Sequence, residues 1–78
     1  MEELIEFIAC SLVDDPMEVD VRRTHRGSQI VLKLRVAKED MGRVIGKRGR
    51  VANAMRTLLR VAAAQESKRA NLDIVEPR

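Results

Sequence analysis

The run Gly46-Lys47-Arg48-Gly49 constrains this chain more than any other segment. Glycine at both ends allows the main chain to pass close to a ligand without a Cβ in the way. An apolar segment precedes the run, and a long segment with a helical apolar stripe follows it, so Gly49 opens a helix. The first N–H groups of a helix and the positive end of its dipole attract anions, and Lys47 and Arg48 add positive charge there. The run therefore predicts a phosphate-binding turn between two helices.

Two common nucleotide-binding motifs do not fit the spacing of these glycines. A Walker A loop has four residues between its glycines, followed by Lys and then Ser or Thr. Only three residues separate Gly42 from Gly46, and Arg48 occupies the position of the hydroxyl. A dinucleotide fingerprint needs three glycines after the first strand of a βαβ unit, which the chain lacks. The remaining alternative is an ordinary corner between two helices, although such a corner does not need a basic pair between its glycines.

Charge is distributed unevenly along the chain. Residues 1–20 contain seven acidic side chains and no Lys or Arg, whereas residues 21–60 contain twelve basic and two acidic ones. Residues 61–78 are balanced, and the formal net charge of the chain is +3. Such a basic block is either a cationic surface for a polyanion or a solvated surface with a chance imbalance. Arginine outnumbers lysine eleven to four and is the better partner for phosphates and bases, which favours nucleic acid.

Length and composition predict one cytosolic domain that is not an enzyme. Seventy-eight residues leave room for one core, no apolar run approaches the roughly 20 residues of a membrane span, and the acidic N-terminus is unlike a signal peptide. The single cysteine, Cys10, fits a reducing compartment and, with His25, is too little for a structural zinc site. No motif places a base beside a nucleophile, so no metal or cofactor is expected. Phe7 is the only aromatic residue, which excludes base recognition by stacked rings.

Hydrophobic periodicity predicts six elements in the order helix, strand, strand, helix, helix, strand. The last two helices connect the second strand to the third as a crossover, so these two strands are expected to be parallel neighbours. The second strand would then be central, and its additional apolar residue Val31 fits that place. The predicted bounds are helix 2–13, strand 17–22, strand 30–36, helix 38–45, helix 50–66 and strand 71–75. The chain is therefore expected to be an α+β domain.

This order of elements around the glycine run resembles a type II KH domain, in which a GXXG loop clamps the backbone of about four nucleotides. The segment Asp40-Met41-Gly42-Arg43-Val44-Ile45-Gly46-Lys47-Arg48-Gly49-Arg50, followed by Ala54-Met55-Arg56-Thr57-Leu58, is similar to the small bacterial KhpA (YlqC-type) proteins. The resemblance in order and length covers essentially the whole chain. It implies a single KH domain over residues 1–78, with αββααβ order and a three-stranded sheet packed against three helices.

The resemblance also implies a function. KhpA proteins are stand-alone bacterial RNA-binding proteins and probable RNA chaperones or post-transcriptional regulators, and they associate with themselves and with the larger KhpB (Jag-type) protein. In some bacteria the pair affects cell-wall homeostasis and cell length. The alternative is a protein-interaction module of KH shape in which RNA binding is incidental, and the basic pair favours RNA. The candidate RNA-binding residues, from the loop and the adjacent groove, are Arg43, Ile45, Gly46, Lys47, Arg48, Gly49, Arg50 and Val51.

Several residues near the loop have two interpretations that the sequence leaves open. Gly42 lies within a short helix, where glycine costs up to about 1 kcal/mol relative to alanine, so either the long helix packs closely against it or RNA crosses its surface. Of Val44 and Ile45, one is expected in the core and one in the groove, because adjacent helical residues point about 100° apart. Lys33 and Arg35 share one face of the central strand, which meets either RNA or solvent.

The second half of helix 50–66 is expected to carry a surface for self-association. One inward stripe is predicted to contain Val51, Met55, Leu58 and Ala62, and additional apolar residues then fall on other sides of the helix. Leu59 and Ala63, four residues apart, would form a second stripe that the small sheet cannot cover. The alternative is scattered exposed apolar residues, which are common. Together with the KhpA resemblance, this stripe predicts a homodimer or a heterodimer with a KhpB-type protein.

Overall fold

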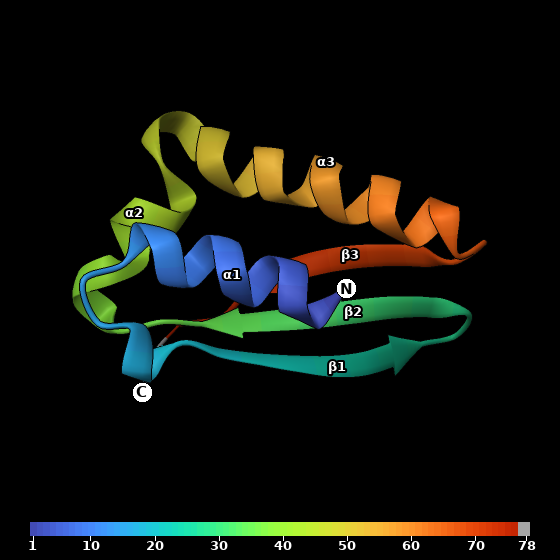
Figure 1. The fold of residues 1–78 in the computed structure, drawn as a ribbon, viewed down its shortest axis with the longest axis horizontal. Helices are drawn as coiled ribbons and strands as arrows, with labels where there is room; N and C mark the ends of the chain where they lie inside the picture. The colour runs from blue at the N-terminus through green and yellow to red at the C-terminus, as the bar shows by residue number, and fades with distance from the viewer. Residues whose placement is uncertain (77–78) are drawn as a thin grey trace.

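The computed structural model describes residues 1–76 of the chain. In this range, three α-helices and three strands follow one another in the predicted αββααβ order, with short 3₁₀ turns between some of them (Figure 1). Within it, no helix combines the length and the apolar character that crossing a membrane would require. The bounds are α1 Glu2–Leu12, η1 Pro16–Glu18, β1 Asp20–Arg26, β2 Gln29–Arg35, η2 Lys38–Asp40, α2 Met41–Ile45, η3 Lys47–Gly49, α3 Arg50–Gln65 and β3 Arg69–Ile74.

The strands form one mixed sheet in the order β1–β2–β3. β1 and β2 pair antiparallel across a two-residue turn, in which Gly27 has a φ of +63°. β2 and β3 pair in parallel because α2 and α3 return the chain to the end of the sheet from which β2 starts. The predictions of a central second strand and of a parallel third strand are both confirmed, and Val31 of the central strand is 2% exposed.

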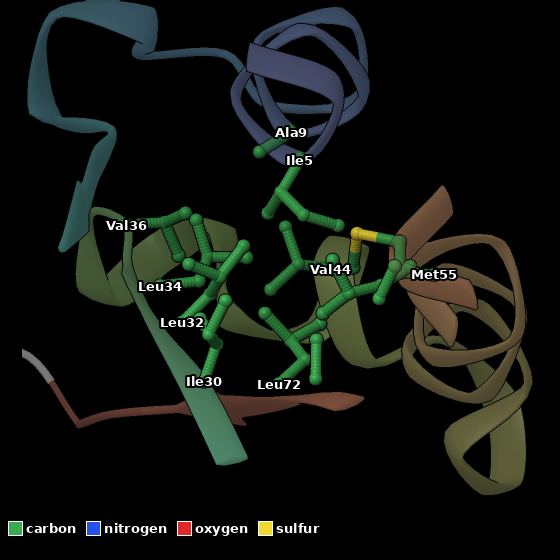
Figure 2. Packing of buried hydrophobic residues seen from close by; sticks show 12 residues of the cluster. Ile5, Ala9, Ile30, Leu32, Leu34, Val36, Val44, Met55 and Leu72 are labelled. Atoms are coloured by element: carbon green, nitrogen blue, oxygen red, sulfur yellow. The ribbon is translucent and has the colours of Figure 1, made fainter. Parts of the chain in front are cut away.

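The hydrophobic core lies between one face of the sheet and the helices. Alternate residues of β2 point into it, as expected for the two-residue period of a strand. Figure 2 shows the side chains of Ile5 and Ala9 from α1 above those of β2. Met55 from α3 lies at the right of the cluster, and Leu72 from β3 lies at the bottom. The buried members of the cluster are Ile5, Ala9, Ile30, Leu32, Leu34, Val36, Val44, Met55, Leu59, Ala63, Ala70 and Leu72.

The first strand begins later than its predicted range of 17–22. Met17 lies in η1 and is 90% exposed, and β1 runs from Asp20 to Arg26. Pro16 favours the 3₁₀ turn because its ring fixes φ at a helical value and its missing N–H is not needed at the first position. The alternation of apolar residues at 17, 19 and 21 predicted an earlier start, but pairing with β2 sets the bounds of the strand.

The inward face of α3 differs from the prediction by a rotation of about one residue. The buried residues are Ala52, Met55, Leu59 and Ala63, whereas Leu58, predicted to point inward, is 49% exposed. Both sets have helical spacing, and a shift of one residue turns a side chain by about 100°. Leu59 and Ala63 are fully buried against the sheet and α1, so the prediction that they form an exposed seam is wrong.

A buried carboxylate joins the loop after α1 to the start of α2. Asp40 is 2% exposed, and its two carboxylate oxygens accept hydrogen bonds from the main-chain N–H groups of Asp14 and Asp15 at 3.0 and 3.1 Å. Arg43 lies 3.4 Å from the same carboxylate and donates a hydrogen bond of 2.8 Å to Asp14. The sequence indicated only that Asp40 suits a helix start. In the structure it satisfies N–H groups that follow the end of α1 and holds this loop against α2.

The position of α3 can be tested by two matched substitutions on one helix. Leu59→Ala should lower the free energy of unfolding by about 2–5 kcal/mol, because it leaves a cavity in the core. Leu58→Ala should lower it by less than about 1 kcal/mol, because that side chain keeps half of its surface in water. Urea denaturation followed by far-ultraviolet circular dichroism gives both values, and equal losses would contradict the observed face of α3.

Candidate nucleic-acid interface

Glycine at position 46 makes the sharp reversal between α2 and α3 possible. Its φ of 74° and ψ of 175° lie in a region that is essentially restricted to glycine. A Cβ at this position would lie 2.5 Å from Val51 Cγ2 and 2.9 Å from the Val51 main-chain nitrogen. A side chain at position 46 is therefore excluded for two independent reasons, the backbone conformation and the close approach of Val51.

The two residues before α3 are in the left-handed region. Arg48 has a φ of 58° and a ψ of 25°, and Gly49 has a φ of 76° and a ψ of 15°. This conformation costs arginine about 1–2 kcal/mol. The Gly49 N–H donates to the Gly46 carbonyl, and the Arg50 N–H donates to the Lys47 carbonyl. These two hydrogen bonds close the turn, so the N–H of Arg50 is already used within the loop.

Three exposed cations lie in the loop and at the first residue of α3. Lys47, Arg48 and Arg50 are exposed, and within residues 1–76 none of them lies within 4.0 Å of a carboxylate oxygen. The predicted site residue Arg43 differs, because its guanidinium is paired with Asp14 and Asp40. The structure therefore brings all four cations to the same corner but leaves three of them uncompensated.

The apolar flank of the loop follows the prediction for adjacent helical residues. Val44 is fully buried, whereas Ile45, at the end of α2, is 37% exposed. Val51, which follows the loop in the first turn of α3, is half-buried. Gly42 is exposed, and a Cβ built on it would meet nothing within 4 Å outside its own helix. Close packing of α3 therefore does not explain Gly42. Its small size leaves an open surface on α2, and the other interpretation, in which RNA crosses this surface, stays a prediction.

Arg56, which was not among the predicted site residues, lies on the side of α3 that faces β3. Arg56 donates from Nε to the Leu72 carbonyl of β3 at 3.2 Å and from Nη1 to Asn53 Oδ1 at 3.1 Å. β3 is an edge strand, so this contact covers part of an otherwise free edge. Arg56 and Asn53 are three residues apart on one helical face, and that spacing was the only available signal for the pair.

The face of the sheet away from the core carries Lys33 and Arg35. The neighbouring residues Leu32 and Leu34 point into the core, so the two cations point the other way. Lys33 is exposed and Arg35 is half-buried, with a buried Nε that has no hydrogen-bond partner in the described part of the chain. The pair is therefore on the opposite face of the sheet from the helices that flank the GXXG loop (residues 46–49).

The two loop glycines should differ in their tolerance of a side chain. Gly46→Ala should cost about 1–3 kcal/mol of unfolding free energy through its conformation, with a further loss from the contact with Val51. Gly49→Ala should cost about 1–2 kcal/mol, because its left-handed conformation is strained for alanine but the nearest atom to a Cβ there is 3.9 Å away. Thermal and urea unfolding of both variants would measure the difference. A larger loss for Gly49→Ala would contradict the geometry of the loop.

Comparison with known proteins identifies the chain as a KH domain. A model of the KhpA/KhpB KH domain matches residues 2–74. RNA-binding protein KhpA of Caldanaerobacter subterraneus subsp. tengcongensis is 49% identical over 75 residues, and KhpA of Clostridium acetobutylicum is 51% identical over 75 residues, each match covering 96% of this chain and 100% of the relative. KhpA of Listeria monocytogenes serovar 1/2a is 46% identical over 76 residues, covering 97% and 100%.

No solved structure matches the chain at a comparable level. The relatives are named as RNA-binding proteins and none of those above is named as an enzyme, which agrees with a non-enzymatic family. The match to the family and to these relatives extends over nearly the whole length of the chain, so the protein belongs to the KhpA/KhpB family of KH-domain proteins.

Proposed function

We propose that this protein binds single-stranded RNA through the GXXG loop and the apolar surface beside it. The observation that carries the proposal is the set of three exposed cations that form no ion pair within residues 1–76, at a turn that requires glycine at position 46. RNA phosphates would contact Lys47, Arg48 and Arg50, and bases would lie on the side of Ile45 and Val51. The family relatives named as RNA-binding proteins support the same ligand.

The conformation of Arg48 also supports a binding role. A non-glycine residue in the left-handed region is strained, and such residues cluster at functional sites. Here the strained residue is a cation in an exposed loop. Its guanidinium has no partner within the described chain that would compensate for the strain, which is expected if the partner is a ligand.

Binding is expected to be weak and tolerant of sequence. Phe7 lies on α1 and is 72% exposed, away from the loop, so no aromatic ring is available to stack on a base. Aliphatic walls and backbone contacts discriminate poorly among bases. This behaviour suits an RNA chaperone or post-transcriptional regulator in the cytoplasm, which must bind many transcripts and release them.

Removal of the two loop cations should abolish RNA binding and leave the fold intact. Lys47→Asp with Arg48→Asp places acids beside phosphates, whereas aspartate is among the side chains that best tolerate the left-handed conformation. We expect at least a roughly thirtyfold loss of affinity, about 2 kcal/mol, for a single-stranded RNA of about five nucleotides. Fluorescence anisotropy measures binding, and circular dichroism measures folding.

A charge-matched variant separates the loop from net charge. Lys33→Glu with Lys38→Asp makes the same change in charge on two exposed lysines of other elements, and it should retain most of the affinity. Equal losses in both variants would point to non-specific attraction. Unchanged binding in the loop variant would sink the proposal and favour the alternative, a KH-shaped protein-interaction module in which RNA is incidental.

The proposed partners include a second copy of the chain or a KhpB-type protein, and by resemblance the pair would act in cell-wall and cell-length control. Because Leu59 and Ala63 are buried, a contact through α3 would use other residues of this helix. Leu58 and Val61 are 49% and 55% exposed and lie three residues apart, so they share one side of the helix. A dimer at this surface would place two GXXG loops on one particle and raise apparent affinity through effective concentration.

Self-association through α3 predicts a specific loss of the dimer. Leu58→Glu with Val61→Glu should produce monomers at micromolar concentration, because two acids would face their own copies across the contact. Phe7→Glu is a matched control, since it removes a large exposed apolar residue from α1 instead. Sedimentation velocity distinguishes the forms. A monomeric wild type would refute the dimer, and a double variant that stays dimeric would place the contact elsewhere.

A further inference from the structure

A basic hollow lies at the end of the molecule opposite the GXXG loop. The loop sits where α2 meets α3, whereas this hollow lies at the turn from α3 to β3, beside the β1–β2 hairpin (Figure 1). The molecule is 35 Å long, and α3 runs along that length. The hollow has a volume of about 350 Å³ and is lined by Gln29, Arg60, Ala64, Lys68, Arg69 and Ala70.

Three of these six lining residues are cations and none is an acid. Arg60, Lys68 and Arg69 are all exposed, and within residues 1–76 their side chains form no ion pair. Glu66 lies in the same turn but is not part of the lining. In contrast, the cations Arg22, Arg23 and Arg43 each have a carboxylate partner. The hollow is therefore a local concentration of positive charge that the described chain does not neutralise.

The turn that carries Lys68 is held in place by the end of α3. The N–H of Lys68 donates to the Ala63 carbonyl at 2.9 Å, and the N–H of Ser67 donates to the Ala64 carbonyl at 3.0 Å. Ser67 has a φ of 57°, so the pattern is that of a Schellman cap with serine where glycine is usual. The cap fixes the backbone of Lys68 next to Arg69 at the rim of the hollow. It also occupies the carbonyl groups that would otherwise repel an anion there.

A line of polar side chains on α3 connects the hollow to the loop. The polar residues Asn53, Arg56 and Arg60 are spaced by three or four residues, and they share one side of the helix with Ala64, which lines the hollow. Arg56 is hydrogen-bonded to the Leu72 carbonyl, which places this side of α3 along the edge strand β3. From Arg50 to Arg60 the helix rises about 15 Å. The cations of the loop and of the hollow thus lie toward the two ends of α3, with Arg56 between them.

We infer that the hollow binds phosphate groups of the same RNA strand after it leaves the GXXG loop. The inference rests on the proposed function, because the loop sets where the strand begins. A KH loop holds about four nucleotides, and the hollow extends the contact to nucleotides beyond them. A phosphodiester chain is favoured over a single free anion because Arg60, Lys68 and Arg69 come from α3, the following turn and β3, so the hollow offers separate positive charges to successive phosphates.

The test is the dependence of affinity on RNA length. The variant Arg60→Gln, Lys68→Gln, Arg69→Gln is compared with wild type on single-stranded RNAs of about five and about twelve nucleotides. The wild type should bind the longer RNA more tightly, and the triple variant should lose roughly tenfold on that RNA alone. The slope of log affinity against log salt should become shallower by about 0.7 for each phosphate contact removed. Sedimentation checks that the oligomeric state is unchanged.

A charge-matched control makes the result specific to the hollow. Arg22→Gln, Lys33→Gln, Lys38→Gln removes three exposed cations elsewhere and should preserve the preference for the longer RNA. The inference is overturned if the triple variant keeps the wild-type preference, if it weakens both RNAs equally, or if the control variant loses the preference equally. The loop variant reports separately on the proposed function, since it should lose the short RNA. A loop variant that still binds the short RNA would refute that function whatever the hollow does.

Discussion

The close approach of Val51 to Gly46 is the constraint on which the rest of this structure depends. It fixes the angle at which α3 leaves α2, and that angle determines how α3 lies along the sheet and where β3 can start. A parallel third strand requires the chain to return to the starting end of β2, and only a tight reversal between α2 and α3 allows this within so few residues. The same reversal turns Lys47 and Arg48 outward, because Val51 occupies the space inside the corner.

Cations in this protein divide into two groups by whether the fold uses them. Arg23 donates to Glu2 at 2.6 Å and lowers the pKa of that carboxyl, which joins α1 to β1. Arg43 joins α2 to the loop after α1 through Asp14 and Asp40, and Arg56 covers the edge of β3. The cations at the two ends of α3 contribute to no such contact in residues 1–76. Their charge opposes the compact state slightly, so a ligand is a better explanation of their positions than stability.

The parts of the fold that follow from local rules could be predicted from the sequence. The order of elements, the central strand and the glycine turn all follow from periodicity and from the conformations that glycine allows. The inward face of α3 could not be predicted, because two sets of residues form equally good helical stripes. These are residues 51, 55, 58 and 62, and residues 52, 55, 59 and 63. Packing against α1 and the sheet decides between them, and Ala52 and Ala63 are too small to dominate a hydrophobic pattern. The main-chain partners of Asp40 (Asp14 and Asp15) and of Arg56 (Leu72) are distant in sequence, so no local pattern could reveal these contacts.

For the candidate site residues, the sequence predicts where the cations of the loop lie. It does not predict which cations are already paired with carboxylates. Arg43 and Arg48 carry the same formal charge. Arg43 is paired with two carboxylates, whereas Arg48 has a strained backbone and forms no ion pair within residues 1–76. This difference would determine which of the two guanidinium groups can contact an RNA phosphate. A domain without aromatic rings near its loop gains little from stacking, so its affinity depends on the number of phosphates that uncompensated cations can reach. In the binding mode inferred above, the number of cations that a strand meets along α3 would limit binding more than the quality of any single contact.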